Sequence, residues 1–426
     1  MVADLAQRGG SGEHRAFALE RAYRCEPRSD RAQALAEVLE GRGEWARAAD
    51  VWAHAEDATL SLGRCALRAG RLEQSAAALD DLLRRIPGHP EATRLRGHVA
   101  AERGAWATAR AMLGSLDDAA SLADLSRVHR LAGDWDAAVA TAKDSIEHTP
   151  TAAAYGRLAE AHLEASNSAE ALDAADNAIR LAPDEPRVHM LAMRCALVAG
   201  DPARALSVVR DDAPHAGIQS MRTLALAADG RTDEAEALRG LDRFLRTRTL
   251  GIDVDALATA LDDVVWNEAP ASHATVDGAH SADLARGAAE PIDAVLDAIG
   301  EAVVSHARDL PKRRHAWLAA RPTVTALHAW SVRLRGPGHQ TPHVHPDGWM
   351  SGVLYLRVPS ADAPAGALRF AGPDAQLAAL ASVTTRTLMP APGRLVLFPS
   401  HLWHETVPTA VHDERLSLAF DVLPQR

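Results

Sequence analysis

Three histidines in the C-terminal part of the chain could bind one metal ion. His343 and His345 are separated by a single residue, so on an extended strand both side chains project to the same side. His404 lies further along, after an apolar segment at Leu395–Phe398 that is typical of a buried strand. Imidazole nitrogen is a good ligand for Fe(II), and three ligands on one face of an octahedron leave three positions open. The pattern therefore predicts an iron site that can also bind substrates and oxygen.

The residues around these histidines resemble the 2-oxoglutarate- and Fe(II)-dependent oxygenases. In that superfamily a His-x-Asp pair is followed by a distal His and then by Arg or Lys, an order in which Arg415 follows His404 here. Arg415 and Ser417 are similar to the Arg-x-Ser pair that holds the distal carboxylate of 2-oxoglutarate. Residues 343–356 (HVHPDGWMSGVLYL) and 415–422 (RLSLAFDV) resemble, more narrowly, a bacterial group in which this oxygenase follows tetratricopeptide repeats.

This resemblance implies a site and a reaction. The metal ligands would be His343, His345 and His404, and the co-substrate would be held by Arg415, Ser417 and Tyr355. Tyr355 could hydrogen-bond the co-substrate carboxylate or serve only as a core residue. The implied cofactors are Fe(II), 2-oxoglutarate and O2, and 2-oxoglutarate would be converted to succinate as the substrate is hydroxylated. No catalytic acid, base or nucleophile beyond the metal ligands is expected.

Two ligand positions have rivals in the sequence. The superfamily places a carboxylate where this chain has His345, and the register His345-Pro346-Asp347 would restore His-x-Asp. We favour His343 and His345, because residues 336–342 resemble the glycine-rich strand that delivers the first ligand in prolyl hydroxylases. His401 is the rival for the distal position, and the family spacing to Arg415 favours His404. The remaining histidines nearby are expected outside the ligand set, with His339 and His412 on loops and His273 and His280 at the surface.

The C-terminal part is predicted to be a double-stranded β-helix, which is a jelly roll of the cupin kind. Pro291–Asp309 is apolar at helical spacing and predicts an amphipathic helix that backs the sheet. Several short segments predict antiparallel strands, namely 323–327, 329–335, 351–356, 366–370 and 394–399. The polar segment Ala269–Gly287 could be a linker or a loop that covers the site.

The N-terminal part, from about Arg21 to Gly240, repeats a Gly-x-x-x-x-Ala pattern. The glycines are Gly43, Gly70, Gly104, Gly133, Gly200 and Gly230, and Ser166 apparently takes the missing place. Glycine permits a tight turn and alanine allows paired helices to approach. The pattern resembles tetratricopeptide repeats, in which helix pairs stack into a curved solenoid.

These observations predict a multidomain α + β protein. An α-solenoid of tetratricopeptide-like repeats would occupy residues 1–240 and the oxygenase domain residues 241–426. The net charge of −11 argues against nucleic acid or an anionic membrane as a partner. The three cysteines are well separated, no signal peptide is visible in Met1–Glu20 and no apolar stretch is long enough to span a membrane. We therefore expect a cytoplasmic protein.

The first functional hypothesis is hydroxylation of a side chain in a peptide or protein that the repeats recognise. The repeats could instead form a homodimer or pack against the enzyme. Two other functions remain open, namely a three-histidine iron dioxygenase that needs no 2-oxoglutarate and a scaffold or sensor without turnover. The sequence does not name the substrate or the atom oxidised.

Overall fold

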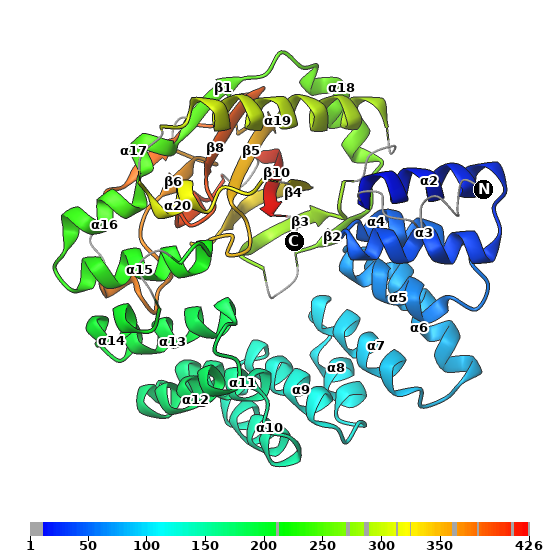
Figure 1. Cartoon of the computed structure of the whole chain (residues 1–426), viewed down its shortest axis with the longest axis horizontal. Helices are drawn as coiled ribbons and strands as arrows, with labels where there is room; N and C mark the ends of the chain where they lie inside the picture. The colour runs from blue at the N-terminus through cyan, green and yellow to red at the C-terminus, as the bar shows by residue number, and fades with distance from the viewer. Residues whose placement is uncertain are drawn as a thin grey trace.

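The computed structural model describes residues 12–209, 213–269, 273–284, 289–311, 314–323, 325–359, 364–380, 383–409 and 413–424. His412 and parts of the Ala269–Gly287 segment lie outside these ranges. An arc of helices runs from the N-terminal end and curves around one side of a sheet domain formed by the C-terminal residues (Figure 1). Among the described residues, no helix has the length and apolarity needed to cross a membrane.

The arc is a solenoid of helix pairs. Within the described residues, helix α2 (Gly12–Cys25) precedes seven pairs. These are α3 (Ser29–Gly41) with α4 (Trp45–Trp52), α5 (Thr59–Arg68) with α6 (Leu72–Arg85), α7 (Pro90–Glu102) with α8 (Trp106–Leu113), α9 (Ala119–Leu131) with α10 (Trp135–His148), α11 (Ala152–Glu164) with α12 (Ser168–Leu181), α13 (Pro186–Val198) with α14 (Pro202–Ser207), and α15 (Ala216–Ala228) with α16 (Thr232–Arg239).

The predicted turn glycines lie between the two helices of each pair. All six have positive φ, from 68° at Gly104 to 79° at Gly133, a region that suits glycine because it has no Cβ. Ser166 has φ of 61° at the corresponding place between α11 and α12, so the prediction that it replaces a glycine is confirmed. The small residues that follow, such as Ala48, Ala109 and Ala138, are fully buried and allow the helices to approach closely.

The C-terminal domain contains two antiparallel sheets. The larger has seven strands in the order β1-β8-β5-β10-β4-β3-β2, and the smaller has the order β7-β6-β9. The strands are β1 (Arg246–Thr249), β2 (Trp266–Glu268), β3 (Thr275–Ser281), β4 (Thr325–Gln340), β5 (Met350–Arg357), β6 (Leu368–Phe370), β7 (Arg386–Leu388), β8 (Arg394–Pro399), β9 (His404–Thr406) and β10 (Glu414–Pro424). The predicted jelly roll with a helical first part is therefore confirmed.

Each central strand of the large sheet has one face toward helices and one toward the small sheet. Helices α18 (Val254–Asp262) and α19 (Glu290–Asp309) cover the outer face, as predicted for α19, and pack on Leu416, Leu418 and Phe420 of β10. The short helices α17 (Leu241–Phe244) and α20 (Ala316–Ala319) also contact this domain, and a 3-10 turn spans Ala378–Leu380. Because side chains alternate along a strand, Arg415, Ser417 and Asp421 point to the inner face.

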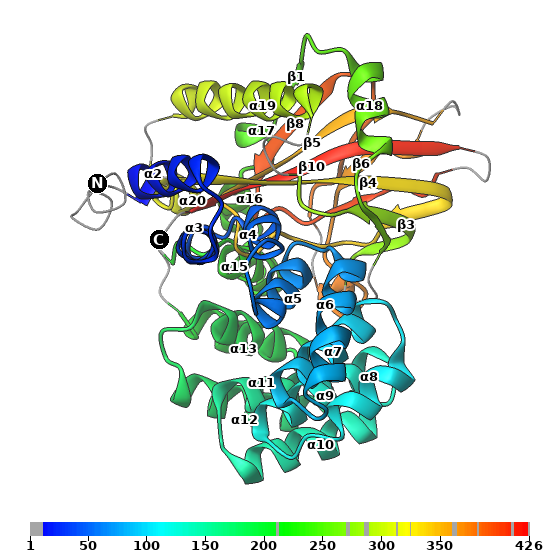
Figure 2. The same ribbon diagram turned by 90° about the vertical axis from the view of Figure 1, so that its right-hand side faces the viewer.

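Both ends of the arc contact the sheet domain (Figure 2). Near its beginning, the backbone oxygen of Gly70 accepts a hydrogen bond from Asn267 Nδ2 at 2.5 Å. Near its end, Leu377 and Trp403 join one hydrophobic core with side chains of α13 and α15. At α13 and α15 the solenoid therefore shares a hydrophobic core with the sheet domain.

The shared core predicts that one leucine of the sheet domain stabilises the whole chain. Leu377 is fully buried and lies in the cluster with Met193 and Met221 of the solenoid. Leu377→Ala should lower the free energy of unfolding by about 2–5 kcal/mol, the usual range for a buried leucine. Urea unfolding followed by tryptophan fluorescence would measure this, with Leu181→Ala as an exposed control that changes little. A loss confined to one of two separate transitions would contradict the shared core.

Candidate metal centre

The histidines that the sequence singled out come together through backbone pairing. His343 lies between β4 and β5, and it forms an isolated antiparallel bridge with His404 at the start of β9. The amide of each donates to the carbonyl of the other at 3.0 Å, and the His345 amide donates to the Ser400 carbonyl at 3.1 Å. Candidate ligand atoms of His343, His345 and His404 all lie within 4.8 Å of one another. Two segments distant in sequence therefore place three imidazoles around one point.

All three rings use Nδ1 to bond an acceptor of the protein. His343 Nδ1 donates to Thr341 O at 2.8 Å, and His404 Nδ1 donates to Leu402 O at 2.9 Å. His345 Nδ1 lies 2.8 Å from Oδ2 of Asp421, the inward-facing carboxylate of β10. Carbonyl and carboxylate oxygens only accept, so each Nδ1 carries the proton and a neutral ring keeps its lone pair on Nε2. The tautomers thus leave three Nε2 atoms as ligands.

Burial keeps two of these rings uncharged at neutral pH. It lowers the pKa of His343 to about 4, with a further contribution from His345. Burial also holds the pKa of His404 well below its usual range, and the other two rings of the cluster add to that effect. A metal ion therefore does not have to displace protons from His343 or His404.

The rival ligands point elsewhere. Asp347 forms an ion pair with Arg187 of α13, and its Oδ1 lies 3.5 Å from His215 Nε2, just before α15. The ring of His401 is buried, and its Nε2 lies 3.2 Å from the carbonyl oxygen of Arg239 at the end of α16. Both side chains are thus turned toward the solenoid and do not belong to the three-histidine group.

Arg415 lies on the same inner face as a buried cation with free hydrogen-bonding capacity. It is 1% exposed, and its Nε and Nη1 have no hydrogen-bond partner among the residues that the structure describes. Its guanidinium lies 5.0 Å from the ring centre of Tyr355, and within the same residues the buried Tyr355 hydroxyl has no hydrogen-bond partner either. Burial raises the pKa of Tyr355, so that hydroxyl stays protonated and can donate. Ser417 is paired with Tyr355 in the register of β10 and β5. Unpaired buried donors of this kind are costly and indicate an anionic ligand.

Sequence reasoning missed several neighbours of the cluster. Asp421 was not singled out, although its alternation with Arg415 and Ser417 in one strand places it on the inner face. Trp330 of β4 lies nearly parallel to the His345 ring, with centroids 5.9 Å apart.

One of the nearby histidines differs from expectation. His273 is exposed as predicted, but His280 is half-buried, and its Nε2 lies 2.6 Å from Thr275 Oγ1. Burial, together with the neighbouring His273 and His343, lowers the pKa of His280 to about 3. Arg333 of β4 lies on the outer face and pairs with Asp262 at 2.5 Å.

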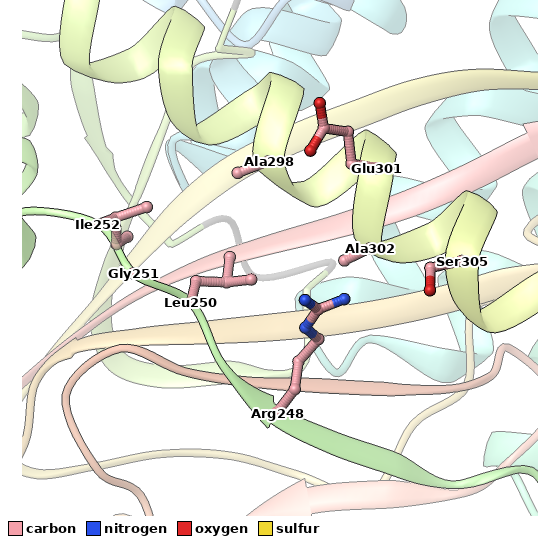
Figure 3. Close-up of a pocket in the computed structure, with 8 residues that line it drawn as sticks. All are labelled: Arg248, Leu250, Gly251, Ile252, Ala298, Glu301, Ala302 and Ser305. Carbon is pink, nitrogen blue, oxygen red and sulfur yellow. The ribbon is translucent and has the colours of Figure 1, made fainter.

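The open pocket drawn in Figure 3 is separate from this centre. It lies between β1 and α19, where Arg248, Glu301 and Ser305 are among its lining residues. Helix α19 covers the outer face of the large sheet, whereas the three histidines and Arg415 belong to the inner face. The pocket therefore has no part in the arrangement described above.

The residues present fit Fe(II) and 2-oxoglutarate. Three imidazole nitrogens form a donor set suited to Fe(II), and a set of three leaves coordination positions for other ligands. The guanidinium of Arg415 offers a planar fork to a carboxylate, and Tyr355 can add a neutral donor.

Two family models match the chain. The family described as "Putative 2OG-Fe(II) oxygenase" matches residues 328–421, which contain the three histidines and Arg415. The tetratricopeptide repeat family matches residues 27–90, 60–127, 123–186 and 157–213. The last helix pair, α15 with α16, lies outside these matches. A search of curated proteins gave no significant match.

Solved structures resemble each part separately. A prolyl-4-hydroxylase from Pseudomonas putida is 20% identical over 48% of this chain and 100% of its own, with a TM-score of 0.33. A tetratricopeptide repeat protein from Thermus thermophilus is 18% identical over 44% of this chain and 100% of its own, also at 0.33. The match to the Cut9–Hcn1 hetero-tetramer of APC/C covers 43% of this chain and 39% of that chain, at 16% identity and a TM-score of 0.35. The two family models thus identify tetratricopeptide repeats within residues 27–213 and a domain that matches the family described as "Putative 2OG-Fe(II) oxygenase" in residues 328–421.

Proposed function

We propose that the protein is a 2-oxoglutarate- and Fe(II)-dependent dioxygenase that hydroxylates a side chain of a peptide or protein recognised by its repeats. The family of the C-terminal domain supports an oxygenase of this kind. The observation that favours it most is Arg415, a buried guanidinium whose Nε and Nη1 have no hydrogen-bond partner in the described part of the chain. It lies on the same sheet face as three imidazoles that present Nε2 atoms. In a metal-binding domain without an anionic co-substrate, burying such a cation would only lower the stability of the fold.

In this proposal the side chains hold and orient the reactants. His343, His345 and His404 bind the metal, and Arg415 pairs with the distal carboxylate of 2-oxoglutarate. Tyr355 and Ser417 donate hydrogen bonds to the same carboxylate. Iron supplies the activation of oxygen when it is bound. The surrounding apolar side chains, including Phe370 and Phe398, exclude water from the rings.

The solenoid is proposed to present the substrate. Tetratricopeptide repeats generally mediate contacts between proteins, and their curved face is the usual binding surface. In this chain, the charged side chains of α9 and α11 include Arg130, whose Nη1 lies 3.4 Å from Glu164. Glu164 also accepts a hydrogen bond at 3.1 Å from Gln376 of the sheet domain. A polar network therefore continues from the repeats to the oxygenase domain and connects the proposed recognition surface with the domain that carries the three histidines.

A second candidate is an iron dioxygenase that needs no 2-oxoglutarate. The ligand set of three histidines without a carboxylate favours this reading, whereas the unpaired Arg415 favours the first. Succinate release in the presence of substrate would separate the two, and would also distinguish an enzyme from a scaffold or sensor without turnover.

The proposal predicts which substitutions remove the metal. His404→Ala should abolish binding of Fe(II), because one of three nitrogens is lost, whereas His401→Ala should retain it because that ring bonds Arg239 O. Asp347→Asn should also retain the metal, since its carboxylate is directed to Arg187. Metal content after anaerobic loading and desalting would be measured by elemental analysis. Loss of iron in His401→Ala or Asp347→Asn, with retention in His404→Ala, would contradict the assignment.

The co-substrate contact predicts a specific role for Arg415. Arg415→Ala should weaken 2-oxoglutarate binding by roughly 2–5 kcal/mol, which is about thirty-fold or more in dissociation constant. Arg415→Lys should recover part of the affinity, because the charge remains but the planar fork does not. Anaerobic titration of the charge-transfer absorption of the Fe(II) protein with 2-oxoglutarate would give the constants.

A matched control for Arg415 is Arg369→Ala. Arg369 also belongs to the sheet domain, but it pairs with Glu405 at 2.6 Å and is half-exposed. Its removal should leave both iron and 2-oxoglutarate binding unchanged. Equal dissociation constants for wild type, Arg415→Ala and Arg415→Lys would show that Arg415 does not hold the co-substrate.

A further inference from the structure

Asp421 belongs to a closed ring of hydrogen bonds that includes one of the three histidines. Its Oδ2 lies 2.8 Å from His345 Nδ1, and its Oδ1 accepts from Ser351 Oγ at 2.6 Å. The Ser351 hydroxyl lies 2.7 Å from that of Ser400, whose carbonyl in turn accepts from the His345 amide at 3.1 Å. The same hydrogen-bond network thus holds the imidazole and the backbone amide of His345. It fixes the direction in which Nε2 of this imidazole points.

This ring of hydrogen bonds is shielded from water. Asp421 is 8% exposed, and Ser351 and Ser400 are 1% and 0% exposed. Gly348 packs against it, because a Cβ there would lie 2.5 Å from Ser400 Oγ and 3.6 Å from Asp421 Cγ. A charge in such a place is strongly felt by its neighbours, since little solvent screens it.

Asp421 is the carboxylate available to the cluster. Both of its oxygens accept hydrogen bonds, from His345 Nδ1 and from Ser351 Oγ, as those of an ionised carboxylate do. Two other carboxylates are already engaged, because Asp283 lies 2.7 Å from His328 Nε2 and Glu405 pairs with Arg369. Asp421 instead lies beside a ring of the cluster, with its Oδ2 2.8 Å from His345 Nδ1.

We propose that Asp421 supplies, through His345, the negative charge that a carboxylate ligand supplies in the His-x-Asp pattern. The inference rests on the proposed function and makes Asp421 a positioning residue, since it would not touch the metal itself. A ligand histidine that donates its second N–H to a carboxylate becomes a more basic ligand with a fixed tautomer.

The charges of the proposed complex support this role. A metal dication, a 2-oxoglutarate dianion and the Arg415 cation together leave one positive charge, and Asp421 brings the total to zero. Buried charge is stable only when it is compensated, so the site with neutral imidazoles alone would lack an anion. In the His-x-Asp pattern the carboxylate binds the metal itself. Here the carboxylate of Asp421 accepts a hydrogen bond from Nδ1 of His345, on the side of the ring away from Nε2.

The substitution Asp421→Asn removes the negative charge of this side chain but keeps its shape. An asparagine of the same shape can still accept from His345 Nδ1 and can donate to Ser351 Oγ, but it carries no charge. The affinity of the Asp421→Asn variant for Co(II) should fall about 10–100-fold, which is the usual effect of changing the hydrogen-bond partner of a ligand histidine. Competition with a chromophoric chelator would measure this dissociation constant on the full-length protein, and the absorption of bound Co(II) would report any change in the ligand field.

A carboxylate restored at position 345 should rescue the loss. In His345→Glu, the new carboxylate reaches about as far from the backbone as Nε2 does, and it brings the charge directly to the metal. The double variant His345→Glu/Asp421→Asn should therefore bind Co(II) more tightly than Asp421→Asn alone. Adding Asp421→Asn to His345→Glu should cost less than about twofold, the scatter expected of independent sites.

Two control variants distinguish the loss of the Asp421 charge from a general effect on folding. Asp283→Asn removes a carboxylate from a similar His–Asp pair outside the cluster and should leave Co(II) affinity unchanged. Ser351→Ala breaks the hydrogen-bond ring but keeps the charge of Asp421, so its affinity should fall much less than that of Asp421→Asn. The Tm of each metal-free variant would show whether it is folded.

The outcomes separate this inference from the proposed function. If wild type binds neither Co(II) nor Fe(II), both are wrong. If wild type binds metal and Asp421→Asn binds it equally well, only the inference is wrong. An equal loss in Ser351→Ala and Asp421→Asn, or a double variant no better than Asp421→Asn, would show that Asp421 acts through the fold alone. If Asp421→Asn alone is unstable, His345→Glu can still be compared with His345→Glu/Asp421→Asn. A loss of affinity well above twofold in that pair would contradict the inference.

Discussion

The antiparallel bridge between His343 and His404 is the interaction on which the centre depends. Two backbone hydrogen bonds of 3.0 Å join the segment before β5 to the start of β9, although each belongs to a different part of the sheet domain. Without this bridge, the distal histidine would have no fixed relation to the other two. The Nδ1 contacts then fix each ring, so the geometry of the cluster is set by backbone groups and by Asp421 before any ion is bound.

The same segment connects the centre to the solenoid. Val344 lies between His343 and His345 and contacts the hydrophobic core that Leu377 and Trp403 share with α13 and α15. The next residues continue this contact, since Pro346 O accepts a hydrogen bond from the Gly217 amide and Asp347 pairs with Arg187. In this short segment His343 and His345 therefore face the three-histidine cluster, whereas Val344, Pro346 and Asp347 face the repeats. This arrangement gives the repeats a structural role at the centre in addition to the substrate recognition that we propose.

Much of the fold was predictable because the relevant signals are local. The turn positions follow from single glycines, and even Ser166 could be placed by its spacing, since the positive φ is required by the helix pair. The amphipathic pattern of α19 and the apolar strands β5 and β8 are likewise properties of short segments. The ligand set was proposed from motif order, and the structure brings those three histidines together.

What could not be predicted depends on contacts between distant residues. Nothing in the sequence near Asp347 indicates that its carboxylate pairs with Arg187 of a repeat, so the rival register could not be set aside. Asp421 looked like any polar residue in a strand, because its role arises from the register that places β10 beside β5 and the loop of His345. The core that Leu377 and Trp403 share with the repeats could not be predicted for the same reason, because in the sequence both residues look like ordinary apolar positions.

Anomalous diffraction from crystals grown without oxygen, in the presence of Fe(II) and 2-oxoglutarate, tests the central claim most directly. Data collected at the iron absorption edge should give one strong peak within bonding distance of the Nε2 atoms of His343, His345 and His404. The distal carboxylate of 2-oxoglutarate should lie on the guanidinium of Arg415. A peak at Asp347 or His401, the absence of iron from the cluster, or an Arg415 that remains without the co-substrate would contradict the account.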